Sequence, residues 1–96
     1  IENLNKAFEN RIRLGIMSAL MVNEAIDFLA LKELLEVTDG NLASHITALE
    51  KLDYIAVKKE FVGKKTRTSY MVTNLGRKEF VQHLNALEKL VKQNRK

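Results

Sequence analysis

A cluster of basic side chains lies in the middle of the sequence. Residues 54–72 carry five basic side chains against the single acidic Glu60, an excess that equals the net charge of +4 of the whole 96-residue chain. Residues 1–53, in contrast, carry five basic and nine acidic side chains. Lysine and arginine gathered on a short segment can bind anions such as phosphates, and a solvated lysine-rich face is the simpler alternative. The candidate anion-binding residues are Lys58, Lys64, Lys65 and Arg67.

Small and hydrogen-bonding side chains form a second candidate site within residues 38–52. Its members are Thr38, Gly40, Asn41, Ser44, His45, Thr47 and Ala48. Short or hydrogen-bonding side chains on the outer turns of a helix can enter the major groove of DNA, where bulky or acidic ones would clash or repel phosphates. His45 could contact a base or a phosphate, or be packed structurally, and Asn41 could contact DNA or only take part in the helix cap. Gly40 lowers helix propensity by up to ~1 kcal/mol relative to alanine, either because something approaches the backbone there or because a first turn tolerates glycine.

The sequence gives no support for enzymatic or metal chemistry. The chain has no cysteine, which excludes disulfides, thiolate metal sites and cysteine nucleophiles. His45 and His83 are the two histidines, and neither belongs to a set of His, Asp and Glu residues with metal-ligand spacing. There is no Ser/His/Asp arrangement and no glycine-rich phosphate loop. We therefore expect no enzyme activity, no cofactor and no metal.

The sequence has no long apolar run, which bears on the expected location of the chain in the cell. No stretch approaches the roughly 18 consecutive apolar residues of a membrane span, and the N-terminal region has no signal-peptide layout. We expect no contact with a membrane and a cytoplasmic location.

Helical periodicity predicts the elements that position the second candidate site. Apolar residues at three- and four-residue steps predict an amphipathic helix over residues 4–22. Residues 27–29 indicate either a brief strand or the lead-in to one short helix over residues 31–35. Thr38 is a typical N-cap, and Leu42, Ile46, Leu49 and Leu52 predict the buried stripe of a helix over about 38–52. Arg13 in the first helix could touch a phosphate or pair with a surface carboxylate.

A change of period predicts a hairpin, followed by a last helix. Alternating residues on both sides of Gly63 predict a two-stranded wing over about 55–72 with a basic turn. Thr73 caps a helix over about 74–93. Together with the first helix, this helix has more apolar residues than so small a monomer can cover, which predicts a homodimer. The expected interface residues are Leu4, Phe8, Leu84, Leu87 and Val91.

The order of these elements defines a fold class. We expect a mainly α structure with a small β-hairpin, in the order α-β-α-α-β-β-α, forming one domain over residues 1–96. This order is typical of a winged helix-turn-helix, in which the helix over 38–52 enters a major groove and the hairpin reaches the neighbouring backbone.

Two motifs also carry a family resemblance. They are Thr-Asp-Gly-Asn-Leu, from Thr38 onward, and Lys-x-Phe-x-Gly-Lys-x-x-Arg-Thr-x-Tyr, from Lys59 onward. With these motifs nearly the whole chain resembles the small stand-alone winged-helix regulators close to the MarR and ArsR families. The resemblance implies a DNA-binding transcriptional regulator, typically a homodimer; some relatives sense small ligands or metals. Thr66 stands where such wings usually have proline, and Ser44 stands where many ArsR-like helices have arginine.

These observations lead to one expected function and one alternative. We expect a sequence-specific regulator that binds double-stranded DNA as a homodimer, on an operator that is an inverted repeat. The alternative is a winged-helix module for protein interaction without an operator. The acidic N-terminal half and the serine at position 44 are the features that favour this alternative.

Overall fold

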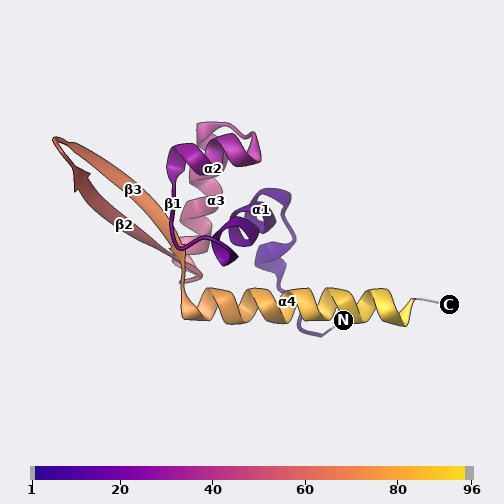
Figure 1. Cartoon of the computed structure of the whole chain (residues 1–96). Helices are drawn as coiled ribbons and strands as arrows, with labels where there is room; N and C mark the ends of the chain where they lie inside the picture. Colours follow the sequence, from indigo (N-terminus) through magenta and orange to yellow (C-terminus); the bar gives the residue numbers. More distant parts are fainter. Residues whose placement is uncertain (1, 95–96) are drawn as a thin grey trace.

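A helical body carries two long projections, a β-hairpin and the last helix (Figure 1). The structure is a computed structural model that describes residues 2–94. Its elements are η1 (Lys6–Phe8), α1 (Arg11–Met21), β1 (Ile26–Asp27), α2 (Phe28–Leu35), α3 (Asp39–Lys51), β2 (Ile55–Val62), β3 (Lys65–Val72) and α4 (Asn74–Gln93). The strands form an antiparallel sheet in the order β1-β3-β2. This confirms the predicted α+β winged-helix order, with a short 3-10 helix added in front.

Each α-helix begins at a residue whose side chain caps it. The side chains of Asn10, Asp27, Thr38 and Thr73 accept hydrogen bonds from backbone N–H groups in the first turns of α1, α2, α3 and α4. Such a cap stabilises a helix by about 1 kcal/mol. The caps predicted at Thr38 and Thr73 are confirmed. Asp27 decides between the two interpretations of residues 27–29, because strand β1 ends at Asp27 and α2 follows directly.

The continuous first helix predicted over residues 4–22 is wrong in its N-terminal part. Asn5 caps the short helix η1, and Asn10 accepts hydrogen bonds from the N–H groups of Ile12 and Arg13, so α1 begins only at Arg11. Asparagine competes with helical backbone in this way because its short side chain can bond to nearby N–H groups. The break turns Phe8 inward.

Phe8 is therefore a core residue of this chain and not part of the expected dimer surface. Its side chain is 2% exposed, and its ring lies 5.1 Å from that of Phe80 and 5.3 Å from that of Tyr54, centroid to centroid. The edge-to-face arrangement with Phe80 is a favourable one for aromatic rings. Phe8 thereby joins the N-terminal segment to α4.

The core lies between α1, α3 and the sheet. On α3 the predicted stripe of Leu42, Ile46 and Leu49 is buried against α1 residues such as Ile16 and Leu20. The predicted stripe is wrong at its end, because Leu52 is the C-cap of α3 and stands partly exposed. One side of α3 is thus fixed in the core, and its other side faces outward.

The hairpin of β2 and β3, which we call the wing, projects from the body between Lys58 and Ser69, which pair with each other across it. Its register pairs Ile55 with Val72 at the base and Val62 with Lys65 at the tip, so that Gly63 and Lys64 form the turn. Gly63 has φ +66, a conformation that favours glycine. The base of the wing is buried or half-buried and its outer half is exposed on both faces. Figure 1 shows the hairpin projecting from the body.

Helix α4 is held at its start and by the N-terminal segment. The N–H of Thr73 donates to the carbonyl oxygen of Tyr54 at 3.0 Å, and Gly76 lies against the same backbone. The backbone N–H of Asn5 donates to Nδ1 of His83 at 2.9 Å, and the Asn5 side chain donates to the Tyr54 hydroxyl at 2.9 Å. Beyond these contacts α4 extends past the body (Figure 1). Among residues 2–94 no helix combines the length and the apolar character needed to cross a membrane.

Candidate nucleic-acid interface

The outward side of α3 is small and polar, as the sequence predicts. Asn41, Ser44 and Thr47 follow each other at three-residue steps and are all exposed. Thr38 and Gly40 are exposed at the start of the helix, while His45 and Ala48 are half-buried at its flanks. Five of the seven predicted residues are thus exposed, and two are half-buried.

Gly40 has no neighbour in the chain that would require a glycine. A Cβ atom built on Gly40 meets no atom within 4 Å, and its backbone is helical. Since packing within the chain leaves this space open, the turn of α3 that contains Gly40 presents bare backbone to the outside. Crowding by another part of the described chain is therefore excluded as the reason for this glycine. Approach by a ligand and simple tolerance of glycine in a first turn both stay predictions.

His45 is tied to α1 through Arg13. The Nε of Arg13 donates a hydrogen bond to Nδ1 of His45 at 3.0 Å. Burial lowers the pKa of His45 below its usual value of 6.5, and the charge of Arg13 lowers this pKa further. Neutral His45 therefore accepts at Nδ1 and keeps its proton on Nε2. Arg13 forms no ion pair with a carboxylate within residues 2–94, so its remaining N–H groups stay available beside α3.

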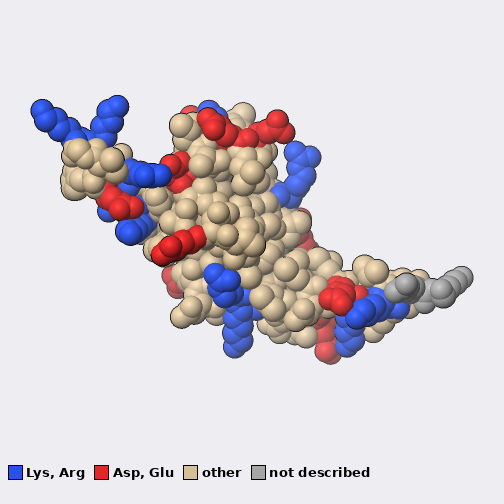
Figure 2. All heavy atoms as spheres, viewed as in Figure 1, with Lys and Arg blue, Asp and Glu red and all other residues tan. Residues whose placement is uncertain are grey.

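The basic residues of the wing fall into two groups. Arg67 forms an ion pair with Asp27 of β1, with 3.2 Å between Nη2 and Oδ2, and Lys58 lies 3.9 Å from Glu60. Lys59 on β2 and Lys64 and Lys65 at the tip have no ion pair among the described residues. Figure 2 shows blue side chains spreading from the end of the wing. The unpaired positive charge thus lies on the outer part of β2 and at the turn, and Arg67 is partly neutralised.

Acidic side chains occupy a different part of the surface. Glu33 and Glu36 are exposed on or beside α2, and red side chains cover this end of the body in Figure 2. Asp39 at the start of α3 is neutralised by Lys32, whose Nζ lies 2.8 Å from its Oδ1. The contrast makes the wing the candidate anion-binding end of the molecule.

Helix α4 presents an uncovered apolar face. Leu84, Leu87 and Val91 share one side of the helix and are exposed, with Val91 at 69%. Leu4, also expected at the interface, is half-buried in the N-terminal segment. The structure therefore brings the three residues of α4 together, but it removes Phe8 from the set.

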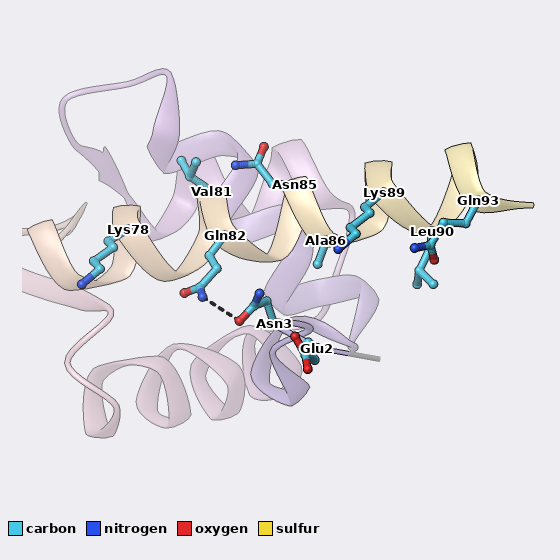
Figure 3. Close-up of a pocket in the computed structure, with 10 residues that line it drawn as sticks. All are labelled: Glu2, Asn3, Lys78, Val81, Gln82, Asn85, Ala86, Lys89, Leu90 and Gln93. Carbon is cyan, nitrogen blue, oxygen red and sulfur yellow. Dashed lines mark hydrogen bonds between the residues drawn. The ribbon is translucent and has the colours of Figure 1, made fainter.

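A groove of about 590 Å³, lined by polar side chains and by Val81, Ala86 and Leu90, runs along another flank of α4, where residues 2 and 3 cross it (Figure 3). Lys78, Gln82, Asn85 and Lys89 follow each other there at four- and three-residue steps, and Nε2 of Gln82 donates to Oδ1 of Asn3 at 2.9 Å. The groove was not predicted from the sequence, because it depends on where the N-terminal segment crosses α4. It leaves one apolar and one polar flank on the same helix.

Sequence reasoning also missed Phe61 as a candidate contact residue. Its side chain is 80% exposed near the tip of the wing. The available signal was the strand alternation itself, which continues with an aromatic residue beyond the last buried position of β2. No three His, Asp or Glu side chains of residues 2–94 come together as metal ligands would.

Comparisons with known proteins agree with this geometry. Residues 12–91 match the family model described as a winged helix DNA-binding domain. The chain is 33% identical over 87 residues to an uncharacterised protein of Methanocaldococcus jannaschii, covering 91% of this chain and 95% of that protein. It is also similar to a transcriptional regulator homologue from Pyrococcus horikoshii OT3, with a TM-score of 0.84, 30% identity, and coverage of 91% of this chain and 86% of that one.

A more distant structure supports the fold alone. It is a putative regulator of the MarR family from Porphyromonas gingivalis W83, with a TM-score of 0.71, 21% identity, and coverage of 94% of this chain and 86% of that one. The small MarR-like regulators that the sequence resembles are thus also its structural neighbours. The chain belongs to the family of winged helix DNA-binding domains.

Proposed function

We propose that this chain is a sequence-specific transcriptional regulator that binds double-stranded DNA in the cytoplasm as a homodimer. The observation that carries the proposal is the small, polar, exposed side of α3, which packs through its other side against α1 and β2. Helix α3 would lie in a major groove, and the wing would contact the adjacent backbone. Lys64 and Lys65, whose charges are free, would bind phosphates there.

The charge of the wing gives the proposal a measurable salt dependence. If a dimer neutralises six to ten phosphates, the logarithm of the binding constant falls against the logarithm of salt concentration with a slope magnitude of roughly 5 to 9. Lys64→Ala should weaken binding to all sequences about equally and reduce the slope by about two per dimer. A flat salt dependence would contradict the proposal.

Substitutions of residues that contact bases should have a different effect from substitutions of residues that contact phosphates. Asn41→Ala, Ser44→Ala and Thr47→Ala should each cost on the order of 1–3 kcal/mol on the preferred site where the side chain makes a good base contact. Binding to random DNA should barely change, in contrast to Lys64→Ala. Equal losses on specific and random DNA for all three variants would place these residues among the phosphate contacts.

The homodimer is supported by the exposed apolar face of α4. A face that repeats along a projecting helix can meet its own copy across a two-fold axis, which needs a self-complementary surface. Two α3 helices would then lie about one DNA turn apart, roughly 34–36 Å, or a multiple of it, on an inverted repeat.

Leu87→Glu tests the dimer, since it would place a charge at the interface in both subunits at once. We expect a folded monomer with low operator affinity, although each DNA-facing residue is intact. Asn85→Glu adds the same charge on the polar flank of α4 and should remain dimeric. Because Leu87 is only 38% exposed, Val91→Glu, at 69%, provides a second variant with less risk to folding. Sedimentation of the wild-type chain as a monomer at tens of micromolar would refute the dimer.

The decisive experiment is selection of bound fragments from the source genome, followed by binding assays. We expect enrichment of an inverted repeat whose half-sites are about one helical turn apart. No enrichment, together with no binding to any duplex at low salt, would overturn the proposal and favour a protein-interaction module.

A further inference from the structure

Phe61 is an aromatic residue that the fold leaves uncovered. It lies near the end of β2, is 80% exposed, and is paired across the hairpin with Thr66. Residues at alternate positions, together with their cross-strand partners, share one face of a sheet, so the nearest neighbours of Phe61 on its face are Lys59, Thr66 and Thr68. None of them is apolar. Phe61 therefore does not cover any part of the hydrophobic core.

The surroundings of Phe61 indicate a polyanionic partner. Lys64 and Lys65, whose charges are free among the described residues, lie at the turn directly beyond it, and the wing projects from the body at this point (Figures 1 and 2). An apolar ring close to unpaired cations suits a ligand that has both negative charge and a stacked aromatic interior. Duplex DNA has both, in its phosphates and its base steps.

We propose that Phe61 is a wedge that enters the minor groove beside the major groove occupied by α3 and partly unstacks one base step. The inference rests on the proposed DNA-binding function and adds to it a specificity-determining residue that acts through DNA shape. Phenylalanine side chains inserted between base steps kink the duplex by roughly 20–90°. Pyrimidine–purine steps deform most readily, so Phe61 selects such a step in the flank of the operator.

The structure favours DNA over a membrane surface as the partner of this side chain. Exposed apolar side chains near the tip are limited to Phe61 and the adjacent Val62, which is a small area for insertion into lipid. The base of the wing is also joined to α3, because β2 packs against that helix. A contact of α3 with the major groove would bring the wing to the neighbouring part of the same duplex.

The test measures DNA bending and local unstacking with the selected operator. Bend angles come from energy transfer between dyes at the two duplex ends, and unstacking comes from a fluorescent adenine analogue placed in turn at each flanking position. The variants are Phe61→Ala, Phe61→Leu, which keeps an apolar wedge, and Lys64→Ala, which keeps the ring. Val22→Ala is the matched control, because Val22 is 81% exposed and lies outside the wing.

We expect the wild-type chain to bend the operator and to raise the fluorescence of the analogue at one step in each flank. Phe61→Ala should lose that rise and reduce the bend by at least about 20°, with an unchanged salt slope, and Phe61→Leu should keep most of both signals. Lys64→Ala should reduce the salt slope and keep the kink in the saturated complex. Val22→Ala should behave as the wild type.

Four outcomes would overturn the wedge. If the wild-type chain binds the operator but neither bends it nor raises the fluorescence of the analogue at any step, the wedge fails while the proposed function stands. If Phe61→Ala bends the operator as the wild type does, Phe61 is not the cause of the bend. If Phe61→Ala instead abolishes binding to vesicles of phosphatidylcholine and phosphatidylserine, with no change in DNA distortion, the side chain serves a membrane. Failure of the wild type to bind any duplex would remove the proposed function together with the wedge.

Discussion

Gly40→Ala should stabilise the free protein and weaken its binding to DNA. Gly40 is the second residue of α3, its backbone is helical, and an added Cβ meets no atom within 4 Å. The other three glycines differ, because a Cβ at Gly15 or Gly76 would overlap a neighbour and Gly63 has a positive φ. Gly40 is thus the one glycine of the chain at which alanine fits the folded structure without strain.

The expected gain in stability follows from the unfolded chain. Replacing a glycine by alanine in a compatible conformation stabilises a protein by about 0.4–1 kcal/mol, because the unfolded chain loses freedom. For a domain of this size 1 kcal/mol shifts the melting temperature by about 4–8 °C, so we expect a rise of about 2–8 °C. Thermal melting followed by circular dichroism measures this rise.

The effect on DNA binding has the opposite sign. If the first turn of α3 lies against the DNA backbone, the new methyl group occupies space that the complex needs. An overpacked contact costs about 1–3 kcal/mol, which corresponds to a loss of affinity of about 5- to 150-fold. Fluorescence anisotropy with the selected operator measures the loss. Asn85→Ala on α4 is the control, since it also raises helix propensity but should leave affinity unchanged.

Each half of this prediction can be refuted separately. A melting temperature that fails to rise would mean that the space around Gly40 is not open in the folded protein. A more stable variant that binds the operator as tightly as the wild type would mean that the first turn of α3 does not lie against DNA. In that case the glycine is merely tolerated there.

Three further substitutions test other parts of the structure. Gly76→Ala should strongly destabilise the chain, because the added Cβ would overlap the carbonyl oxygen of Tyr54, and a wild-type melting curve would contradict that packing. Asp27→Asn keeps a cap on α2 but removes the ion pair of the wing arginine, so in anisotropy titrations DNA affinity should rise and the salt slope should steepen; an unchanged slope would contradict this. Arg13→Ala should raise the pKa of His45 only part of the way to its usual value, because burial is the larger cause of the lowered pKa. NMR titration measures this pKa, and an unchanged pKa in the variant would contradict the prediction. Since that pKa is depressed in the folded state, stability should fall as the pH drops below about 6.5, and by less in the variant.

Local signals explain why α3, α4 and the wing could be predicted. Thr38 and Thr73 are N-caps that act on N–H groups three residues further on, so their effect can be read from a short stretch of sequence. The turn at Gly63 and the alternation before and after it set the register of the wing in the same way. Apolar spacing on α3 then separated the buried side from the side that faces outward.

Contacts between distant residues explain what could not be predicted. The hydrogen bond from Arg13 to His45 spans 32 positions in the sequence, and the ion pair of Arg67 with Asp27 spans 40. Nothing in the sequence near either residue selects its partner. Both contacts change the candidate site, since one occupies Nδ1 of the histidine on α3 and the other partly neutralises the wing. The sequence supplies the residue types, and the packing of α1 and β1 decides which of them remain free.

The N-terminal segment, through Phe8 and Asn5, sets how α4 is placed for the proposed DNA recognition. Because Asn10 breaks the first helix, Phe8 and Asn5 turn toward α4, where they contact Phe80 and His83. These contacts, together with the close approach of Gly76 to the backbone before β2, fix the direction in which α4 leaves the body. In a dimer joined through α4, that direction determines the distance and angle between the two α3 helices. The N-terminal segment would then act on operator spacing without touching DNA.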